Sequence, residues 1–387
     1  MYPVAGANSH GSFMTMPSTA ATPRLAILIS LSGDGGVERM VLNLAGQFAA
    51  MGIATDLVTL KCEGGHAANL PTGVRHVPLG VRHAWLAPRA IAGYLRREQP
   101  AAMLAAKDRA GRAALLGRRR AGTGTRIVIR LGNTLSESLA GRSPVHRWLR
   151  YRPIRRLYPQ AEAIVAVSEG VAEDIIATSG VPKSMVHVIR NPVITPRLAA
   201  LAAAPVRHPW LGTGRAVPVA MGMGRLTRQK DFPTLLRAFA VLRARRPARL
   251  IILGDGADRD SLSTLAGALG IAEDIDLVGF QANPYCWLAQ ADLFVLSSAW
   301  EGSPNALTEA LALGIPAVST DCRSGPRELL DGGRHGPLVP VGDPPALAQA
   351  MEATLEHPLG ADQLSGAVRA YRDDISARAY LDVLGIP

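Results

Sequence analysis

The sequence predicts an α/β protein made of two doubly wound domains that face each other across a deep cleft. A chain of 387 residues exceeds the size that one core comfortably supports, and its 48% of hydrophobic residues can fill two. Short apolar runs without polar alternation recur in both halves between stretches of helical periodicity, which is typical of buried parallel strands. An Ala- and Pro-rich stretch from Asn191 to about Val217 separates the two series and is typical of a linker.

The N-terminal half begins with a β-α-β unit. An apolar strand is expected over 25–31, a glycine loop follows, and a helix over 37–51 leads to a strand over 54–60. Further buried strands are expected over 101–105, 126–130 and 163–167. We therefore expect an N-terminal domain over 24–195. Residues 1–23 are rich in Ser, Thr, Pro, Ala and Gly and lack periodicity, so we expect a disordered leader there.

The C-terminal half repeats the alternation and is expected to form a second domain over 196–370. Its strands are expected over 217–221, 249–253, 275–278, 293–296 and 317–319, and its helices over 232–244, 259–269, 284–289 and 304–313. Residues 371–387 contain a helical pattern that we expect to cross back to the first domain. The carboxyl ends of both sheets converge in such a pair of domains, so a ligand is expected to bind in the cleft.

Cysteine usage and hydropathy set the expected compartment. The three cysteines, Cys62, Cys286 and Cys322, are an odd number without metal-ligand spacing, and no secretory signal pattern stands near the N-terminus. We therefore expect a cytoplasmic protein. No apolar stretch approaches the roughly 20 residues that span a bilayer, so any contact with a membrane is expected at its surface.

The positive charge is concentrated in one segment. The chain has a net charge of +11, and residues 95–156 alone contain sixteen basic and three acidic side chains. Such a segment can attract anionic lipid headgroups, a phosphate-bearing acceptor or nucleic acid, while an arginine-rich solvated surface is the structural alternative. Nucleic acid is the weakest of these, because no zinc finger, RNA-recognition signature or run of aromatic residues accompanies the arginines.

Two carboxylates separated by seven residues, Glu301 and Glu309, flank a predicted helix start. Ser303 suits the N-cap and Pro304 the first helical position, so the helix should continue through Asn305. The N–H groups of that first turn favour an anion such as a diphosphate. Since a phosphate repels carboxylates, the two glutamates are expected to accept hydrogen bonds from sugar hydroxyls. The alternative is that Glu301 lies in a surface loop and Glu309 on a solvated helix face.

A glycine-containing loop over 222–231 follows a strand and leads into a helix. Gly224 lets the backbone approach a ligand closely, while Arg225 and Lys230 present two cations to a diphosphate. The loop has neither the dinucleotide fingerprint nor the P-loop pattern, and a tight turn with two surface cations is the alternative.

A second glycine loop, 33–36, precedes Glu38 at the first strand–helix turn. Helix N–H groups there can reach a phosphate or a sugar, and a simple tight turn is the alternative. Asp274 and Asp276 have the spacing of a metal-binding aspartate pair, but they lead directly into a strand, so no metal role is expected.

Together these motifs resemble those of the GT-B glycosyltransferases, specifically the retaining enzymes of family four that use nucleotide sugars. The resemblance extends from Leu25 to about Leu355 and rests on the following motifs in order: Gly35-Gly36 with Glu38, Val167-Ser168-Glu169, Arg190-Asn191-Pro192, Gly224-Arg225 with Lys230, Gly254-Asp255-Gly256, Glu301 through Ala310, and Gly314-Ile315-Pro316. It implies two facing Rossmann-like domains and metal-independent transfer without a cofactor.

The resemblance also implies residue roles. Glu301 would contact the donor-sugar hydroxyls, Glu309 the ribose, and the strand end at Gly279-Phe280 the base. Arg225 and Lys230 would hold the diphosphate, so Glu301, Arg225 and Lys230 are the catalytic candidates. The donor-binding set comprises Gly35, Gly36, Gly224, Gly279, Phe280, Gly302, Ser303, Pro304, Asn305, Ala306 and Glu309.

The acceptor side departs from the family pattern. Many members carry a histidine after the fourth strand of the first domain, where this chain has Arg130 and Asn133. The acceptor-side candidates are therefore Glu38, Arg130 and Asn133, and which of the last two replaces the histidine stays open.

The implied reaction moves a sugar from a nucleoside-diphosphate donor, a UDP-sugar in preference to a GDP-sugar, to a hydroxyl of a lipid-linked or surface-polysaccharide glycan. The sequence offers no obvious nucleophile, which favours front-face attack over a covalent sugar–enzyme intermediate. The basic segment motivates a position on the inner face of the plasma membrane. Two rivals remain: a nucleotide-sugar epimerase of the same shape, and a non-catalytic protein that binds nucleotide sugars or polyanions.

Overall fold

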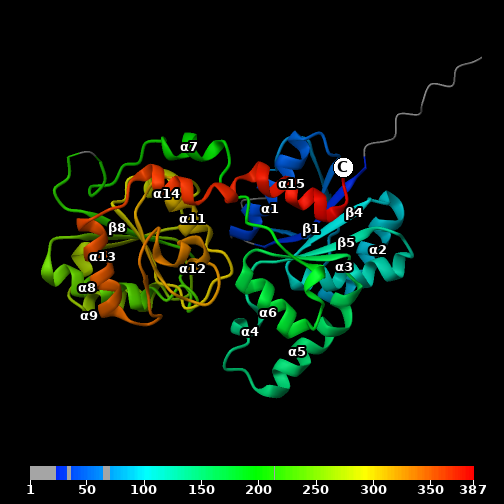
Figure 1. Cartoon of the computed structure of the whole chain (residues 1–387), viewed down its shortest axis with the longest axis horizontal. Coiled ribbons are helices and arrows are strands. Elements are labelled where there is room, and N and C mark those ends of the chain that lie inside the picture. The colour runs from blue at the N-terminus through cyan, green and yellow to red at the C-terminus, as the bar shows by residue number, and fades with distance from the viewer. Residues whose placement is uncertain (1–22, 33–35, 64–69, 213) are drawn as a thin grey trace, which may run out of the picture.

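The chain folds into two α/β domains that lie side by side (Figure 1). The computed structural model describes residues 23–32, 36–63, 70–212 and 214–387. The predicted leader up to residue 22 and Gly35 lie outside the described residues. Each domain has a central parallel sheet covered by helices, which confirms the predicted fold class.

Seven parallel strands form the sheet of the N-terminal domain, in the order β3-β2-β1-β4-β5-β6-β7. The strands are β1 (Leu25–Ser32), β2 (Thr55–Glu63), β3 (Val74–Pro78), β4 (Ala102–Ala106), β5 (Arg126–Leu131), β6 (Ala163–Ala166) and β7 (Val186–Val188). The helices are α1 (Gly36–Ala50), α2 (Ala87–Glu98), α3 (Asp108–Ala121), α4 (Leu135–Ser138), α5 (Pro144–Leu157) and α6 (Glu169–Ser179). In β1, Ala26 and Leu28 face one core while Leu25 and Ile27 face the other, which explains its continuous apolar sequence.

Six parallel strands form the C-terminal sheet, in the order β10-β9-β8-β11-β12-β13. The strands are β8 (Val219–Met223), β9 (Arg249–Leu253), β10 (Ile275–Gly279), β11 (Leu293–Leu296), β12 (Ala317–Thr320) and β13 (Leu338–Val339). The helices are α8 (Phe232–Arg245), α9 (Arg259–Ala268), α10 (Tyr285–Leu288), α11 (Asn305–Ala312), α12 (Pro326–Leu329), α13 (Pro344–Glu356) and α14 (Ala361–Ala367). Two apolar cores, one on each face, complete this domain.

In both sheets the strand order reverses beside the first strand. β1 lies between β2 and β4, and β8 lies between β9 and β11. Connections leave such neighbouring strands toward opposite faces and open a crevice at the carboxyl ends. The loops after β4, β8 and β11 are therefore placed to contact a ligand, whereas residues 33–35 after β1 lie outside the described residues.

The chain crosses between the domains twice, and the crossings lie together. Ile194 and Arg372 form an isolated parallel bridge between them. The helices that follow the two crossings are α7 (Arg197–Ala202), within the predicted linker, and α15 (Asp373–Leu384). α15 lies along the N-terminal domain (Figure 1), where Tyr380 and Leu384 are fully buried in the core that includes α1.

The sequence patterns failed mainly at the edges of the sheets. β3, β7 and β13 were not predicted, and β3 and β7 are the two edge strands of their sheet while β13 is an edge of the other. An edge strand is covered on fewer sides, so it needs no continuous apolar run. β3, for example, has the sequence Val-Arg-His-Val-Pro and is not fully buried at any position.

A buried carboxylate on β2 joins three neighbouring groups in the N-terminal domain. Asp56 accepts hydrogen bonds from Arg24 (2.8 Å), from Arg75 (2.6 and 2.8 Å) and from the Tyr94 hydroxyl (2.7 Å). Burial by itself raises the pKa of Asp56, but the hydrogen bonds from Arg75, Tyr94 and Arg24 outweigh it, and the pKa is lowered. The folded protein therefore binds the Asp56 proton less readily than the unfolded chain does.

Asp56→Ala is expected to lower the free energy of unfolding by roughly 1–3 kcal/mol, because it leaves the buried Tyr94 hydroxyl and the partly exposed Arg24 and Arg75 guanidinium groups without their acceptor. The depressed pKa means that the Asp56 contribution is complete above the unfolded pKa, near 4, and is lost as the pH falls through the lower folded pKa. Urea titrations at pH 7 and at about pH 3 measure both effects. Glu173→Ala, an exposed carboxylate in the same domain, is the control and should cost less than about 0.5 kcal/mol. Equal losses in the two variants would contradict the assignment.

Candidate active site at the domain interface

The carboxyl ends of the two sheets face each other, and the loops that leave them are in direct contact. The Asn191 amide donates to Asn305 Oδ1 at 2.7 Å, and the Asn305 amide donates to the Gly36 carbonyl at 3.3 Å. Arg130 Nη2 donates to Asn191 Oδ1 at 2.6 Å. A continuous chain of hydrogen bonds therefore crosses from the N-terminal domain to the first residue of α11 and back.

A second set of contacts joins the domains at the start of α6. The Glu328 carboxylate accepts hydrogen bonds from the N–H groups of Glu169 (2.9 Å) and Gly170 (3.0 Å) and pairs with Arg190 at 2.6 Å. A carboxylate is favourable at this position because the first N–H groups of a helix have no partner within the helix. The two sets of contacts hold the domains in a closed arrangement.

Glu301 is buried in the loop between β11 and α11 and is paired with a cation. Lys230 Nζ lies 2.5 Å from Glu301 Oε1, and the Ser298 hydroxyl donates to the same oxygen at 2.7 Å. The side chain of Glu301 is 6% exposed and that of Lys230 19%. The structure thus brings together two of the three predicted catalytic residues, and the predicted surface-loop alternative for Glu301 is wrong.

The loop that carries Lys230 is packed against the loop that carries Glu301. The Ala299 N–H donates to the Gln229 carbonyl at 2.8 Å, and the Gln229 side chain donates to the Trp300 carbonyl at 3.0 Å. Gly254 packs against the loop that carries Lys230. Only glycine allows this approach, because a Cβ atom at position 254 would lie 2.0 Å from the Gly224 carbonyl oxygen. The backbone contacts therefore position Lys230 independently of its ion pair.

Arg225 follows β8 at the carboxyl edge of the sheet. Its side chain is exposed, and within the described part of the chain no carboxylate lies within ion-pair distance of it. Its guanidinium is therefore available to an anion, unlike the ammonium group of Lys230.

Glu309 is buried on α11 and faces the other domain. Arg39 Nη1, on α1, lies 3.6 Å from Glu309 Oε1 and donates to the Tyr285 hydroxyl at 2.8 Å, and that hydroxyl donates to Glu309 at 3.3 Å. Burial raises the pKa of Glu309, and Arg39, Tyr285 and Lys230 oppose this shift. The solvated-helix alternative for Glu309 is therefore wrong.

The start of α11 differs by one residue from the prediction. Pro304 is the N-cap residue with extended backbone, Asn305 is the first helical residue, and no side chain caps the helix. Ser303 is therefore not the N-cap, because the helix begins after the proline instead of with it. Among the described residues, no hydrogen bond occupies the N–H groups of Asn305 and Ala306, so both can donate to an anion.

The space between α1 and the start of α11 is small. A Cβ atom at Gly302 would lie 2.0 Å from the Gly132 carbonyl oxygen of the other domain, so only glycine permits this approach. The cavity lined by Gly36, Arg39, Asn305 and Glu309, among others, has a volume of about 10 Å³. Ligand sites for small molecules usually hold 300 Å³ or more, so this cavity as it stands does not admit a large ligand.

The acceptor-side candidates occupy three different environments. Glu38 is buried and accepts a hydrogen bond from Lys107 Nζ at 2.6 Å. Arg130 is 1% exposed, and burial lowers its pKa. Asn133 is exposed beside the Gly302 contact. Of the three, Asn133 is the one with an exposed side chain, while the buried Arg130 donates a hydrogen bond to Asn191.

The remaining predicted donor residues lie at the end of β10. Gly279 has φ +88°, a left-handed conformation that favours glycine, and its carbonyl accepts from the Gly254 N–H at 2.8 Å. Phe280 follows and is 56% exposed. An exposed aromatic ring at a carboxyl edge can stack on a planar ligand group.

The aspartate pair lies where β10 begins, at the edge of the C-terminal sheet opposite the carboxyl ends of its strands. Asp274 pairs with Arg243 (2.7 Å) and with Arg249, and Asp276 bonds to His208 at 3.0 Å, so neither carboxylate points toward the domain interface loops. No cluster of three or more metal-ligating side chains occurs among the described residues.

Burial, followed by the charge of Glu301, raises the pKa of Cys322 to about 12, so this thiol stays protonated near neutral pH.

Sequence reasoning missed Arg39 and Tyr285. Arg39 directly follows the predicted candidate Glu38, and Tyr285 lies in the predicted helix over 284–289, but no local pattern indicated that they would meet Glu309. Positions 39 and 285 are 246 residues apart in the chain. Only the assembled domains bring them together.

Family models match both domains. Residues 34–197 match the model described as Glycosyltransferase Family 4, and residues 217–357 match the model described as Glycosyl transferases group 1. Together the two matches cover most of the chain.

Curated relatives carry related descriptions. The chain is 38% identical over 149 residues to the uncharacterized glycosyltransferase MJ1059 of Methanocaldococcus jannaschii, covering 38% of the chain and 37% of that protein. It is 30% identical over 228 residues to the N-acetylgalactosamine-N,N'-diacetylbacillosaminyl-diphospho-undecaprenol 4-alpha-N-acetylgalactosaminyltransferase of Campylobacter jejuni, covering 58% of each. The match to the lipopolysaccharide core biosynthesis glycosyltransferase LpsE of Rhizobium meliloti is 29% identical over 332 residues and spans 82% of the chain and 85% of that protein. The chain thus matches less than two thirds of the first two relatives and most of the third.

Solved structures share the whole architecture. The apo form of the lipopolysaccharide outer core galactosyltransferase WaaB aligns with a TM-score of 0.70 at 21% identity, covering 94% of this chain and 99% of that one. The Anabaena protein HepE in complex with UDP and glucose aligns with a TM-score of 0.67 at 19% identity, covering 94% and 97%. At these identities the alignments show the fold, two facing domains of the GT-B type.

Proposed function

Because the chain belongs to the glycosyltransferase family whose domains are described as Glycosyltransferase Family 4 and Glycosyl transferases group 1, we propose that it transfers a sugar from a nucleoside-diphosphate donor to a hydroxyl group of a glycan. The single observation that carries the proposal is the ion pair of Lys230 with the buried Glu301 beside the open N-terminus of α11. This site offers a carboxylate that can accept hydrogen bonds from sugar hydroxyls, and several groups that can donate hydrogen bonds to phosphate.

The donor lies along the C-terminal domain in this proposal. Arg225, Lys230 and the N–H groups of Asn305 and Ala306 hold the diphosphate, because each is a cation or an unpaired donor at the same carboxyl edge. Glu301 accepts hydrogen bonds from the transferred sugar, and Glu309 from the ribose. Phe280 stacks on the base.

Binding requires three rearrangements in the closed structure. Lys230 must turn from Glu301 toward the diphosphate, because the two side chains are paired at 2.5 Å. The domains must part, since a cavity of about 10 Å³ cannot hold a nucleotide sugar. Arg39 must also leave Glu309, because it occupies the carboxylate that the ribose would use. Closing the domains again around the donor then excludes water, which would otherwise hydrolyse it.

The reaction proceeds with retention by front-face attack. The bond between the anomeric carbon and the diphosphate oxygen breaks, and the acceptor hydroxyl attacks from the same face and gives its proton to the departing phosphate oxygen. The two cations and the helix N-terminus stabilise the negative charge on the leaving nucleoside diphosphate, as a divalent cation does in other enzymes. Cys322 does not serve as nucleophile, since its raised pKa of about 12 keeps the thiol protonated.

A UDP-sugar and a lipid-linked or polysaccharide acceptor are the preferred substrates. HepE is described in complexes with UDP and with UDP-glucose, which supports uracil as the base. The names of LpsE and WaaB refer to lipopolysaccharide and that of the Campylobacter enzyme to a diphospho-undecaprenol, which supports a surface-glycan acceptor.

A thermal-shift panel of UDP, GDP and their sugars tests the proposal. UDP and one UDP-sugar are expected to stabilise the protein, by about 2.7 kcal/mol at a hundred times the dissociation constant, and the shift should persist in EDTA. The stabilising donor is then incubated with a glycan acceptor, and transfer is followed by mass spectrometry. A protein that binds no nucleotide sugar, or that epimerises the donor without an acceptor, would refute the proposed transfer.

A further inference from the structure

The helix α5 presents exposed hydrophobic side chains on the N-terminal domain. All residues of 140–149 are exposed, and Val145, Trp148 and Leu149 are 68%, 54% and 58% exposed. Their spacing of three and four residues places them on one side of the helix. Adjoining exposed hydrophobic residues of this kind commonly mark an interaction surface.

Arginines surround this hydrophobic side. Between Glu137 and Glu162 the chain has six arginines and no acidic residue. Within the part of the chain that the structure describes, no carboxylate lies within ion-pair distance of Arg147, Arg152 or Arg156. These charges are not used to hold the fold together, so they are available to an external anion.

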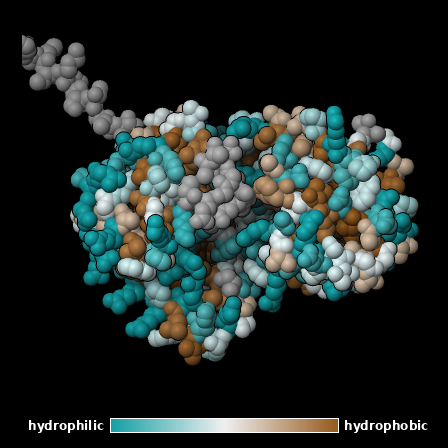
Figure 2. Space-filling view, turned by 180° about the vertical axis from the view of Figure 1, so that it is seen from behind, coloured by the Kyte–Doolittle hydropathy of each residue, from teal (hydrophilic) through white to brown (hydrophobic). Residues whose placement is uncertain are grey.

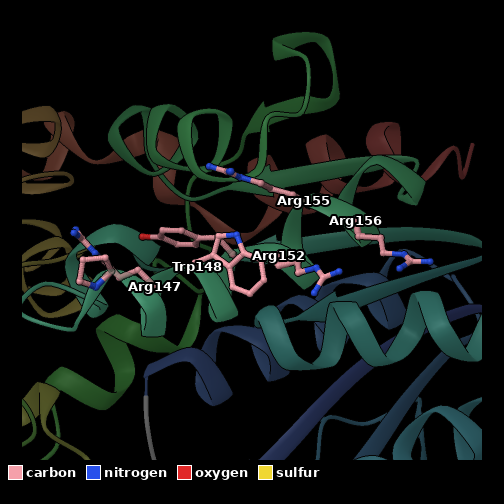
Figure 3. A pocket seen from close by; sticks show the side chains of 7 residues that line it. Arg147, Trp148, Arg152, Arg155 and Arg156 are labelled. Carbon is pink, nitrogen blue, oxygen red and sulfur yellow. The ribbon is translucent and has the colours of Figure 1, made fainter.

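Trp148 and the arginines line one open hollow of about 520 Å³. Its lining residues are Pro144, Arg147, Trp148, Tyr151, Arg152, Arg155 and Arg156. Figure 3 shows Arg147 on one side of the Trp148 ring and Arg152 and Arg156 on the other. The Arg152 guanidinium lies 5.2 Å from the centre of that ring, which keeps the indole and the charge together.

α5 lies at the lower end of the N-terminal domain, near the other domain (Figure 1). In Figure 2 hydrophobic side chains reach the surface at the lower end of this domain, with hydrophilic ones around them. The preceding helix, α4, contacts the C-terminal domain through Glu137, which lies 3.5 Å from Arg323. α5 thus follows, after the short segment 139–143, a helix that contacts the C-terminal domain.

We propose that α5 docks the protein onto a bilayer that carries anionic lipid headgroups. Trp148 occupies the headgroup level with Val145 and Leu149 beside it, while the arginines bind lipid phosphates and lay their aliphatic stems along the interface. A helix of 14 residues is about 21 Å long and cannot cross the bilayer. Among the described residues, no helix has the length and hydrophobicity to do so.

Charge and hydrophobicity together favour a bilayer over the other polyanions. Nucleic acid would satisfy the arginines and could stack on Trp148, but it offers no apolar layer to Val145 and Leu149. A second copy of this chain would bring the same arginines into contact and would repel. Of these three partners, the anionic bilayer is the one that satisfies both the charges and the aliphatic side chains.

The inference rests on the proposed function in one respect. If the acceptor is attached to a lipid, docking through α5 holds the domain interface close to the surface on which that acceptor lies. Docking itself does not depend on the donor, so membrane binding and nucleotide binding are separate measurements.

Flotation with vesicles of phosphatidylcholine, with and without 30 mole per cent phosphatidylglycerol, tests the proposal on the full chain. We expect binding to the anionic vesicles that weakens with added salt. Trp148→Ser should lower the partition coefficient at least about fivefold, and the pair Arg147→Glu with Arg152→Glu at least about tenfold.

Matched controls come from the same domain. Trp85→Ser removes another exposed tryptophan, 74% exposed, and Arg119→Glu with Arg120→Glu makes the same change in charge on α3. Both control proteins should bind vesicles as the wild type does, and the nucleotide-induced thermal shift should be unchanged in all variants. No binding to anionic vesicles, equal losses in the controls, or tighter binding to a DNA duplex than to the vesicles would overturn the proposal. Loss of the nucleotide shift with vesicle binding intact would instead count against the proposed function.

Discussion

Replacing Lys230 with alanine is expected to slow sugar transfer by about 100- to 1,000-fold. In the proposed reaction its ammonium group faces the oxygen that gains negative charge as the diphosphate leaves, and it acts in a site from which water is largely excluded. A charge held in place before the reaction costs no reorganisation when the bond breaks, which is why a single donor has so large an effect. Because the backbone contacts of Gln229 and Ala299 position the loop, the fold should survive the substitution.

Arg225→Ala should also slow transfer by about 100-fold, because Arg225 is the second cation proposed to stabilise the leaving diphosphate. The measurement is the initial rate of transfer with the donor found in the thermal-shift panel. Arg228→Ala provides the control, since Arg228 is an exposed arginine of the same loop. A wild-type rate in Lys230→Ala or Arg225→Ala would show that this residue does not act in transfer. An equal loss of rate in Arg228→Ala would show that the effect comes from the total positive charge of the loop and not from a specific contact.

Glu301→Ala is the second substitution with a large expected effect, a fall in transfer of about 100-fold. The change removes the acceptor of the sugar hydroxyls and leaves both Lys230 and Ser298 without their shared partner. The unfolding free energy should also fall by roughly 1–3 kcal/mol, because donors that Glu301 had satisfied stay partly buried. Glu301→Gln keeps the shape and one hydrogen-bond acceptor, so it should retain more activity than Glu301→Ala.

Ligand binding separates the role of Glu301 from a purely structural one. UDP alone should stabilise Glu301→Ala nearly as much as the wild type, whereas the additional stabilisation by the UDP-sugar should be lost. Glu356→Ala, on the exposed face of α13, is the control and should change neither quantity. If UDP binding is lost to the same extent as UDP-sugar binding, Glu301 acts through the fold of the site. The double variant of Lys230 and Glu301 should lose less than the sum of the single losses, since the two side chains form one pair.

The sequence predicted the architecture because its strongest patterns are local. β9 and β11 begin and end at the predicted residues, since buried central strands are continuous apolar runs. The patterns also identified Glu301, Glu309, Arg225 and Lys230 as functional candidates. Their roles toward the donor stay predictions, because they concern a ligand that the fold alone does not specify.

The contacts across the domain interface could not be predicted. Asn305 and Gly36 are 269 residues apart, and Arg39 and Glu309 belong to different domains. No residue pattern around either member indicates which side chain of the other domain it will meet. Arg130 illustrates the same limit: an arginine in a strand suggests an exposed or ligand-binding side chain, but the assembled fold buries it beneath Gly132 and Asn191.

The position of α15 has a consequence for how the protein is made. The N-terminal domain precedes the C-terminal domain in the chain, yet α15, which follows both, supplies Tyr380 and Leu384 to the core beside α1. During synthesis the N-terminal domain cannot complete this core, and one apolar face stays uncovered, until the second domain and α15 have been synthesised. At about 5–20 residues per second this interval lasts on the order of ten seconds or more. A chaperone that binds exposed apolar surface would therefore act on the N-terminal domain during this interval, although that domain is synthesised first.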